Sequence, residues 1–280
     1  MTNRQLNRIG DIGTYAVYLL VLAFFLMPLA WLLSLSFRKA AEVYIGEIRL
    51  IPHDPTIENY VTVLNNDLFP GYLWNGLKLS ILGALGAMVL AAPAAYAFSR
   101  FRFRFRYPML IGVLLFQMIS PLVIMVPLYR HMDSMGLTES HFGATMLYIA
   151  VAVPLFTWML KGFLDRIPKS LEDSAMIDGC SRFGAFMRIV LPLSLPGLAS
   201  AFILNAILGW SQFIVPYILL TRPNLLPIAV GIFNFHGSFQ ASATQVVAAA
   251  SMISILPAIV VFLLLQRLII GALMAGAVKG

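Results

Sequence analysis

Residues 79–99 read LSILGALGAMVLAAPAAYAFS, a run of 21 residues without a charged side chain. About 20 apolar residues in a helix cross the roughly 30 Å hydrocarbon layer of a bilayer. The whole chain has this character, because 60% of its 280 residues are apolar and only 11% are charged, and its mean hydropathy is +0.87. A water-soluble helix needs a polar face, which these blocks lack. The sequence therefore predicts an all-α integral membrane protein.

Six segments are apolar enough and of about the right length to cross a membrane. They predict six transmembrane helices in one domain over residues 1–280: Ile12–Ser36, Leu79–Ser99, Tyr107–Pro127, Phe142–Leu160, Gly197–Leu220 and Val246–Gln266. The first segment, preceded by Arg4 and Arg8, could be a signal peptide. Its apolar core is too long for one and no small-residue cleavage pattern follows it, so we interpret it as a retained helix.

The distribution of basic residues predicts the orientation. Lys and Arg collect in the loops that stay in the cytoplasm. A cytoplasmic N-terminus places 13 of the 19 basic residues inside: Arg4, Arg8, Arg100, Arg102, Arg104, Arg106, Lys161, Arg166, Lys169, Arg182, Arg188, Arg267 and Lys279. We therefore expect both termini to be cytoplasmic, with a main outer loop at about 37–78 and a cytoplasmic loop at about 165–196 between the fourth and fifth helices.

Residues 100–106 read RFRFRFR, and the net charge is +7. Alternating arginine and phenylalanine could bind single-stranded nucleic acid by stacking. Between two predicted spans, the same pattern is typical of an anchor at the inner leaflet, where guanidinium groups meet anionic headgroups. We favour the membrane anchor and expect no nucleic-acid partner.

No predicted span contains a carboxylate, and the chain has no Gly-x-x-x-x-Gly-Lys-[Ser/Thr] phosphate loop. Ion-driven carriers generally hold an ionisable or cation-coordinating group near mid-membrane. The energy for transport is therefore expected to come from a partner, although an ion-coupled secondary carrier remains the alternative. An intramembrane enzyme is a third hypothesis, but no catalytic motif was found. The single cysteine and four scattered histidines show no metal-ligand spacing.

The loop at 165–196 reads as two short helices separated by a glycine. Ser170 is expected to cap the first helix and Gly179 to end it. Glu172, Asp173 and Asp178 are expected to form an acidic surface that a basic cleft on a partner protein would bind. The alternative is an amphipathic linker lying on the membrane, which the later apolar stripe would support: Phe183, Phe186, Met187, Val190 and Leu191.

This loop resembles a known family. EDSAMIDG at 172–179, followed by IVLP at 189–192, is similar to the "EAA" signature of binding-protein-dependent ABC importer permeases, Glu-Ala-Ala, three residues, Gly, nine residues and Ile-x-Leu-Pro. The likeness is closest to the carbohydrate type related to the second maltose-permease subunit. Asp173 stands where the signature has glutamate, Ser174 replaces its first alanine, and Cys180 replaces the usual alanine after the glycine.

The resemblance implies a role in transport without catalysis in this chain. The short helix would insert into a groove of a separate ATPase, which alone binds ATP and Mg. It implies as partners a homologous second permease subunit, an ATPase dimer, an extracytoplasmic substrate-binding protein and the lipid bilayer of the bacterial inner membrane. The expected coupling residues are Leu171, Glu172, Asp173, Ser174, Ala175, Asp178 and Gly179.

Candidates for the substrate pathway lie in the fifth predicted span. Sugars bind through aromatic faces and side-chain amides or hydroxyls, which singles out Trp210, Gln212, Phe213 and Tyr217. Packing between helices is the alternative role for these aromatic residues. The outer segment at 221–243 resembles the loop that reaches toward the binding protein in this family, and a solvated connection is the alternative.

Overall fold

The computed structural model describes residues 3–45, 49–236 and 244–277, and the described residues are helical without strands. The chain divides into two compact units, Met1–Asp67 with Ile232–Ile255 and Leu68–Gly231 with Leu256–Gly280. The first unit holds α1 (Asn3–Ser36), α2 (Ala40–Ile45), α3 (Glu58–Leu64), η4 (Ile232–His236) and the start of α14 (Thr244–Ala277). Within it, Asn59 donates to the carbonyl oxygens of Ser36 and Arg38 at 2.8 Å each.

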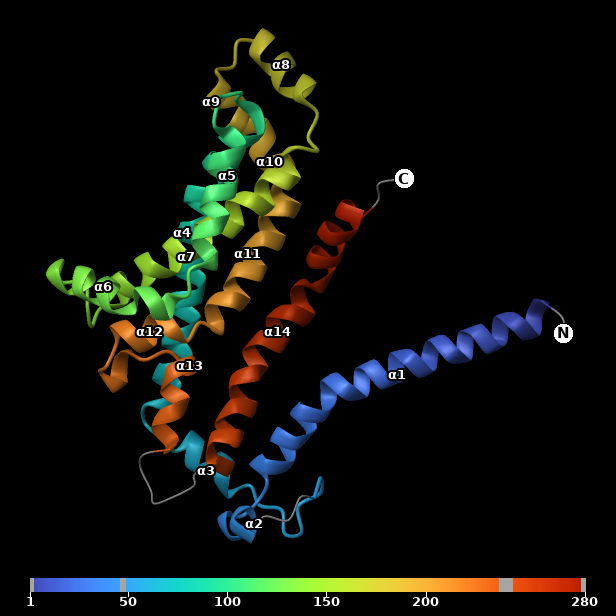
Figure 1. Cartoon of the computed structure of the whole chain (residues 1–280), viewed down its shortest axis with the longest axis vertical. Helices are drawn as coiled ribbons and strands as arrows, with labels where there is room; N and C mark the ends of the chain where they lie inside the picture. Colours follow the sequence, from blue (N-terminus) through green and yellow to red (C-terminus); the bar gives the residue numbers. More distant parts are fainter. Residues whose placement is uncertain (1–2, 46–48, 237–243, 278–280) are drawn as a thin grey trace. The chain divides into compact units, whose positions relative to one another are not determined.

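The second unit is built on three long helices that run side by side (Figure 1): α4 (Phe69–Arg100), α7 (His141–Leu164) and α11 (Leu195–Trp210). The shorter elements around them are α5 (Arg106–Leu115), η1 (Phe116–Met118), α6 (Pro121–Ser134), α8 (Lys169–Ile177), α9 (Arg182–Ala185), the π-helical turn η2 (Phe186–Val190), α10 (Leu191–Leu193), α12 (Ile214–Leu219), η3 (Pro223–Leu225) and α13 (Ile228–Gly231). α8 lies beyond the ends of the long helices (Figure 1).

Small residues on α4 allow α7 and α11 to approach it closely. They recur at every fourth position and are all buried: Gly83, Ala87, Ala91, Ala95 and Ser99. A Cβ atom on Gly83 would lie only 2.8 Å from the Cβ of Tyr148 on α7. Small residues at this spacing let helix backbones pack tightly in membranes, where the hydrophobic effect does not drive helix association.

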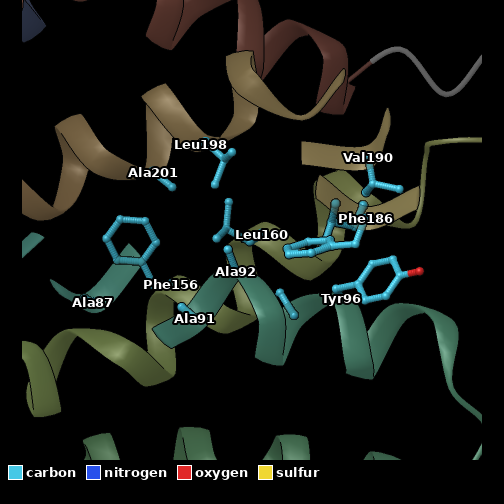
Figure 2. Close-up of a cluster of buried hydrophobic side chains, with 12 residues drawn as sticks. Ala87, Ala91, Ala92, Tyr96, Phe156, Leu160, Phe186, Val190, Leu198 and Ala201 are labelled. Atoms are coloured by element: carbon cyan, nitrogen blue, oxygen red, sulfur yellow. The ribbon is translucent and has the colours of Figure 1, made fainter. Parts of the chain in front are cut away.

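The hydrophobic core of the second unit lies at the α8 end of these helices. Figure 2 shows alanines of α4 facing Phe156 and Leu160 of α7, with Phe186 and Val190 of η2 beside Tyr96. Phe156 and Val190 are completely buried. The π-helical turn η2, which follows α8 and α9 in the sequence, is therefore packed into the core.

Among the described residues, four helical segments are long and apolar enough to cross a membrane: Gly13–Ser36, Phe69–Arg100, His141–Leu164 and Thr244–Leu263. A fifth crossing is possible if Arg182–Leu193 and Leu195–Trp210, bent by 72°, form one span. The prediction of a helical membrane protein is confirmed at this level. The cytoplasmic position of both termini, the number of six transmembrane helices and the single domain stay predictions.

The predicted span Tyr107–Pro127 is not one continuous helix. It divides into α5, η1 and the start of α6. Ser120 is extended (φ −61°, ψ 128°), and Pro121 begins the next helix. Proline disfavours the helical conformation in the residue before it and is well tolerated at the first helical position, which explains the break.

The predicted span Gly197–Leu220 is also interrupted. α11 ends at Trp210 and α12 begins at Ile214. Pro216 has no amide hydrogen to donate to the carbonyl of Gln212 four residues earlier, so a continuous helix would lose this bond. The restart places Pro216 in the first turn of α12, where no such bond is needed, and the Gln212 carbonyl accepts from the Tyr148 hydroxyl at 3.4 Å.

Candidate functional site

α8 presents one face to the second unit and the other outward. Glu172 and Ala175, three residues apart, are buried, while Asp173, Ser174 and Asp178 are exposed. Residues three apart lie on the same face of a helix. The helix therefore offers its outward face for binding while its inward face fixes its position.

The structure corrects the predicted acidic surface, because Glu172 points inward. Its side chain is 7% exposed and forms an ion pair with Arg100, the last residue of α4, with Nε and Oε1 2.5 Å apart. The hydroxyl of Tyr96 donates to the other carboxylate oxygen at 2.8 Å. A carboxylate seldom stays buried unless it is paired and hydrogen-bonded, and here both conditions hold. The exposed acidic surface of α8 consists of Asp173 and Asp178.

The end of α8 depends on Gly179, as predicted. Its φ is +90°, in the left-handed region. The Gly179 amide donates to the Met176 carbonyl at 3.1 Å, and the Cys180 amide donates to that of Ala175 at 2.9 Å. This pair of bonds is a Schellman motif, which satisfies carbonyls left free at a helix end.

The predicted start of α8 is wrong. The helix begins at Lys169 with Pro168 in the capping position, and no side-chain cap is present. The proline supplies the required extended conformation (φ −58°, ψ 130°) without a capping side chain. Ser170 therefore lies inside the helix.

A second set of polar contacts joins the linker before α8 to α4. Ser99 donates to Asp165 Oδ1 at 2.7 Å, and Lys161 pairs with Asp165 Oδ2 at 2.6 Å. Burial acts to raise the pKa of the Asp165 carboxyl, but the hydrogen bonds from Lys161 and Ser99 prevail and hold this pKa below its usual range. Asp165 is consequently ionised at neutral pH.

Two apolar side chains of α8 are exposed, Ile177 at 86% and Leu171 at 43%. Leu171 was among the expected coupling residues, whereas Ile177 was missed by the sequence reading. A polar loop with an isolated isoleucine just before its glycine stop was the signal that could have identified Ile177. Apolar side chains flanked by charges are typical of protein-binding surfaces.

A cavity of about 90 Å³ lies between the long helices of the second unit, and we name it the polar cavity for the five polar side chains in its otherwise apolar lining. Its polar lining comes from α4, η1, α7, α11 and the break after α11, and consists of Ser80, Gln117, Tyr148, Asn205 and Gln212. Gly83 and Gly209 also line it, and a Cβ on either would crowd Tyr148 or Ser80 on the facing helix. The described lining contains no carboxylate, lysine or arginine, so the cavity offers uncharged hydrogen-bonding groups within an otherwise apolar bundle.

The four predicted pathway residues do not meet in one place. Gln212 lines the polar cavity, whereas Trp210 lines a separate apolar cavity of about 150 Å³ between α4, α11 and α14. Phe213 and Tyr217 stack on each other with ring centroids 5.0 Å apart. Tyr217 also borders a hollow with Tyr129 and Arg130. Only Gln212 is thus in the polar cavity.

Sequence reasoning missed Ser80, Tyr148 and Asn205. Asn205 is 5% exposed and its amide donates to the Ala201 carbonyl at 3.1 Å on its own helix. Each of the three is a polar residue inside a long apolar segment, and such residues usually face the interior of a bundle or a water-filled cavity. That they face the same cavity follows only from how α4, α7 and α11 pack.

The end of the second unit away from α8 is held by hydrogen bonds to the segment after α12. The Asn75 amide of α4 donates to the carbonyls of Asn224 and Leu226 at 2.9 and 3.1 Å. Glu139 accepts from the Thr221 amide at 2.8 Å. The start of the predicted binding-protein loop at 221–243 is therefore fixed to its own unit, while 237–243 lie outside the described residues.

Comparisons with known proteins agree with these features. The chain is 34% identical over 262 residues to the trehalose transport system permease protein SugB of Mycobacterium tuberculosis, covering 93% of this chain and 95% of the relative. It is 31% identical over 256 residues to the sulfoquinovosyl glycerol transport system permease protein SmoH of Agrobacterium fabrum, covering 91% and 89%.

A crystal structure of a bacterial ABC transporter that imports the acidic polysaccharide alginate contains a chain of the same fold. The TM-score is 0.76 at 23% identity, and the match covers 95% of this chain and 98% of that one. The family model described as "binding-protein-dependent transport system inner membrane component" matches residues 83–273, which include both α8 and most of the cavity lining. The chain therefore belongs to this family of inner membrane transport components, as the signature at 172–192 predicted.

Proposed function

We propose that this chain is the permease subunit of an importer driven by ATP hydrolysis in a separate ATPase subunit. The observation that carries the proposal is α8, a short helix outside the long apolar helices, with its inward face fixed by Glu172 and its outward face exposed. Asp173, Asp178 and Ile177 form the docking surface for the ATPase, together with Leu171 and Ser174. ATP and Mg are bound by the ATPase, and this chain holds no cofactor.

The substrate we propose is a sugar or a sugar derivative. Support comes from the relatives, whose names specify trehalose and sulfoquinovosyl glycerol. It also comes from the polar cavity, since hydroxyl, amide and phenol groups are the partners that sugar hydroxyls require. We expect Gln212 and Asn205, which line this cavity, to contact the substrate. The stacked rings of Phe213 and Tyr217 offer an aromatic surface nearby in the sequence.

We propose six crossings of the bacterial inner membrane with both termini in the cytoplasm, in which α5 with α6, and α9 to α11, supply the two crossings that are not single straight helices. A homologous permease subunit completes the pathway, and a binding protein delivers the substrate to the outer face.

Charge reversal on the docking surface tests the proposal. Asp173→Lys should abolish copurification of the cognate ATPase from membranes, because a basic cleft would repel the new lysine. Asp67→Lys, the same reversal at an exposed residue of the outer loop, is the matched control and should retain the ATPase. Equal recovery of the ATPase with both variants would contradict the docking assignment.

A further inference from the structure

The buried contacts of Glu172 occupy both of its carboxylate oxygens and leave it no role on the outward face of α8. Arg100 Nε bonds one oxygen and the Tyr96 hydroxyl bonds the other. Tyr96 and Arg100 are four residues apart, so they project from the same face of α4. The inward face of α8 is therefore held at two points by one helix.

Arg100 also holds the chain just before α8. Its Nη2 donates to the Ile167 carbonyl at 2.9 Å, and its Nη1 donates to the Ser99 hydroxyl at 3.1 Å. Ser99 in turn donates to Asp165. One guanidinium thus bonds the linker and the helix together, which its planar array of donors allows and a lysine ammonium would not match.

A buried ion pair contributes little net stability, because removing two charges from water costs about as much as their attraction returns. The side chains of Arg100 and Glu172 are nevertheless only 6% and 7% exposed. Their geometry is specific, because the bonds from Arg100 to Glu172 and to the Ile167 carbonyl, and from Tyr96 to Glu172, all join α4 to the α8 segment. Such a pair fixes one relative position of two elements more than it stabilises the fold.

Two routes connect α8 to the polar cavity. The route along the chain passes through the π-helical turn η2 and a bend of 72° before it reaches α11. The route through Arg100 enters α4, a continuous helix with Pro93 in its interior, which carries Ser80 and Gly83 of the cavity lining. Ser80 lies 20 residues from Arg100, about 30 Å along the helix. The second route stays within one helix, whereas the first crosses a bend of 72°.

We propose that Tyr96 and Arg100 are positioning residues that make α8 and the inner end of α4 move as one body. Movement of α8 by the ATPase is then transmitted along α4 to the cavity. This inference rests on the proposed docking of α8 and adds to it the residues that carry the movement inward.

The first test uses the full-length chain alone in detergent and measures amide hydrogen exchange in Lys169–Ile177. Arg100→Gln should raise the exchange rate at least about tenfold, because it breaks a buried pair. Tyr96→Phe, which removes one hydrogen bond and no charge, should raise it about threefold to tenfold. Arg102→Gln makes the same substitution at an exposed arginine two residues away and should leave exchange unchanged. Equal exchange in Arg100→Gln and Arg102→Gln would overturn the proposal.

The second test uses the complete complex with its ATPase, in a Cys180→Ser background that carries Gln212→Cys as the only cysteine. N-ethylmaleimide labelling of this cysteine reports the cavity. ATP should change the labelling rate in the parent. In Arg100→Gln complexes that retain the ATPase and hydrolyse ATP, the ATP-dependent change should fall at least about fivefold.

The exchanged pair Arg100→Glu with Glu172→Arg restores the ion pair without the bond to the Ile167 carbonyl, so it should recover part of the ATP-dependent change. A full ATP response in Arg100→Gln would overturn the proposal. So would the absence of any recovery in the exchanged-pair variant when this variant is present in the same amount as the parent protein. If the docking of α8 is refuted by unchanged ATPase recovery in Asp173→Lys, hydrogen exchange in the chain alone still decides whether Arg100 holds α8 against α4.

Discussion

Replacing Gly179 by alanine tests whether the backbone at the end of α8 matters for coupling. The φ of Gly179 is +90°, and a Cβ added there would meet no atom within 4 Å. The substitution therefore introduces no clash, and its cost is conformational, about 1–2 kcal/mol for an L-residue in the left-handed region. A change of this size shifts a local equilibrium by roughly 5-fold to 30-fold.

The chain contains a matched control. Gly136, after α6, has φ +67° and open space around its Cβ position. Its amide bonds the Asp133 carbonyl and the Leu137 amide bonds that of Met132, both at 2.9 Å, the same motif as at Gly179. Gly136→Ala should therefore incur a similar cost at a helix end that is not part of the docking surface.

Hydrogen exchange at the two helix ends and recovery of the ATPase from membranes are the assays. Gly179→Ala should accelerate exchange in the last turn of α8 by roughly 5-fold to 30-fold and reduce ATPase recovery, whereas Gly136→Ala should accelerate only its own turn. Gly179→Asn should be milder, since asparagine tolerates the left-handed region. Unchanged exchange in Gly179→Ala beside a clear effect in Gly136→Ala would refute the reasoning.

Three further predictions concern other parts of the structure. Ile177→Asp should reduce ATPase recovery at unchanged thermal stability, because this side chain is 86% exposed; a lowered melting temperature with full recovery would contradict the docking surface. Gly83→Val should destabilise the second unit by about 1–3 kcal/mol through overpacking against Tyr148, 2.8 Å from the new Cβ, and an unchanged melting temperature in detergent would show that α4 and α7 can separate without cost. Because the folded pKa of Asp165 is lowered, its contribution to stability is present above the unfolded value of about 3.9 and lost as pH falls through the folded value. The melting temperatures of the parent and Asp165→Asn should therefore differ at neutral pH and converge in acid. A constant difference across that range would contradict the lowered pKa of Asp165 in the folded state.

The helical membrane class and the short helix that ends before Gly179 were predictable from sequence. The apolar runs at 79–99 and 142–160 correspond to α4 and α7, because run length and composition are local properties that suit a helix in lipid. The stop at Gly179 was predictable for the same reason, since a glycine after a short helical pattern favours the left-handed conformation. The prolines at 121 and 216 also indicated the two helix breaks. The predicted spans ran through both prolines because they were drawn from hydropathy alone.

The direction of Glu172 and the membership of the polar cavity were decided by the tertiary structure. Glu172 and Asp173 are adjacent acids, yet one is buried because Arg100, 72 residues earlier in the chain, lies against that side of α8. Ser80, Tyr148 and Asn205 face one cavity because the small residues of α4 let two other helices approach it. Periodicity along one helix specifies which residues share a face, but which face is covered depends on contacts between segments distant in the sequence.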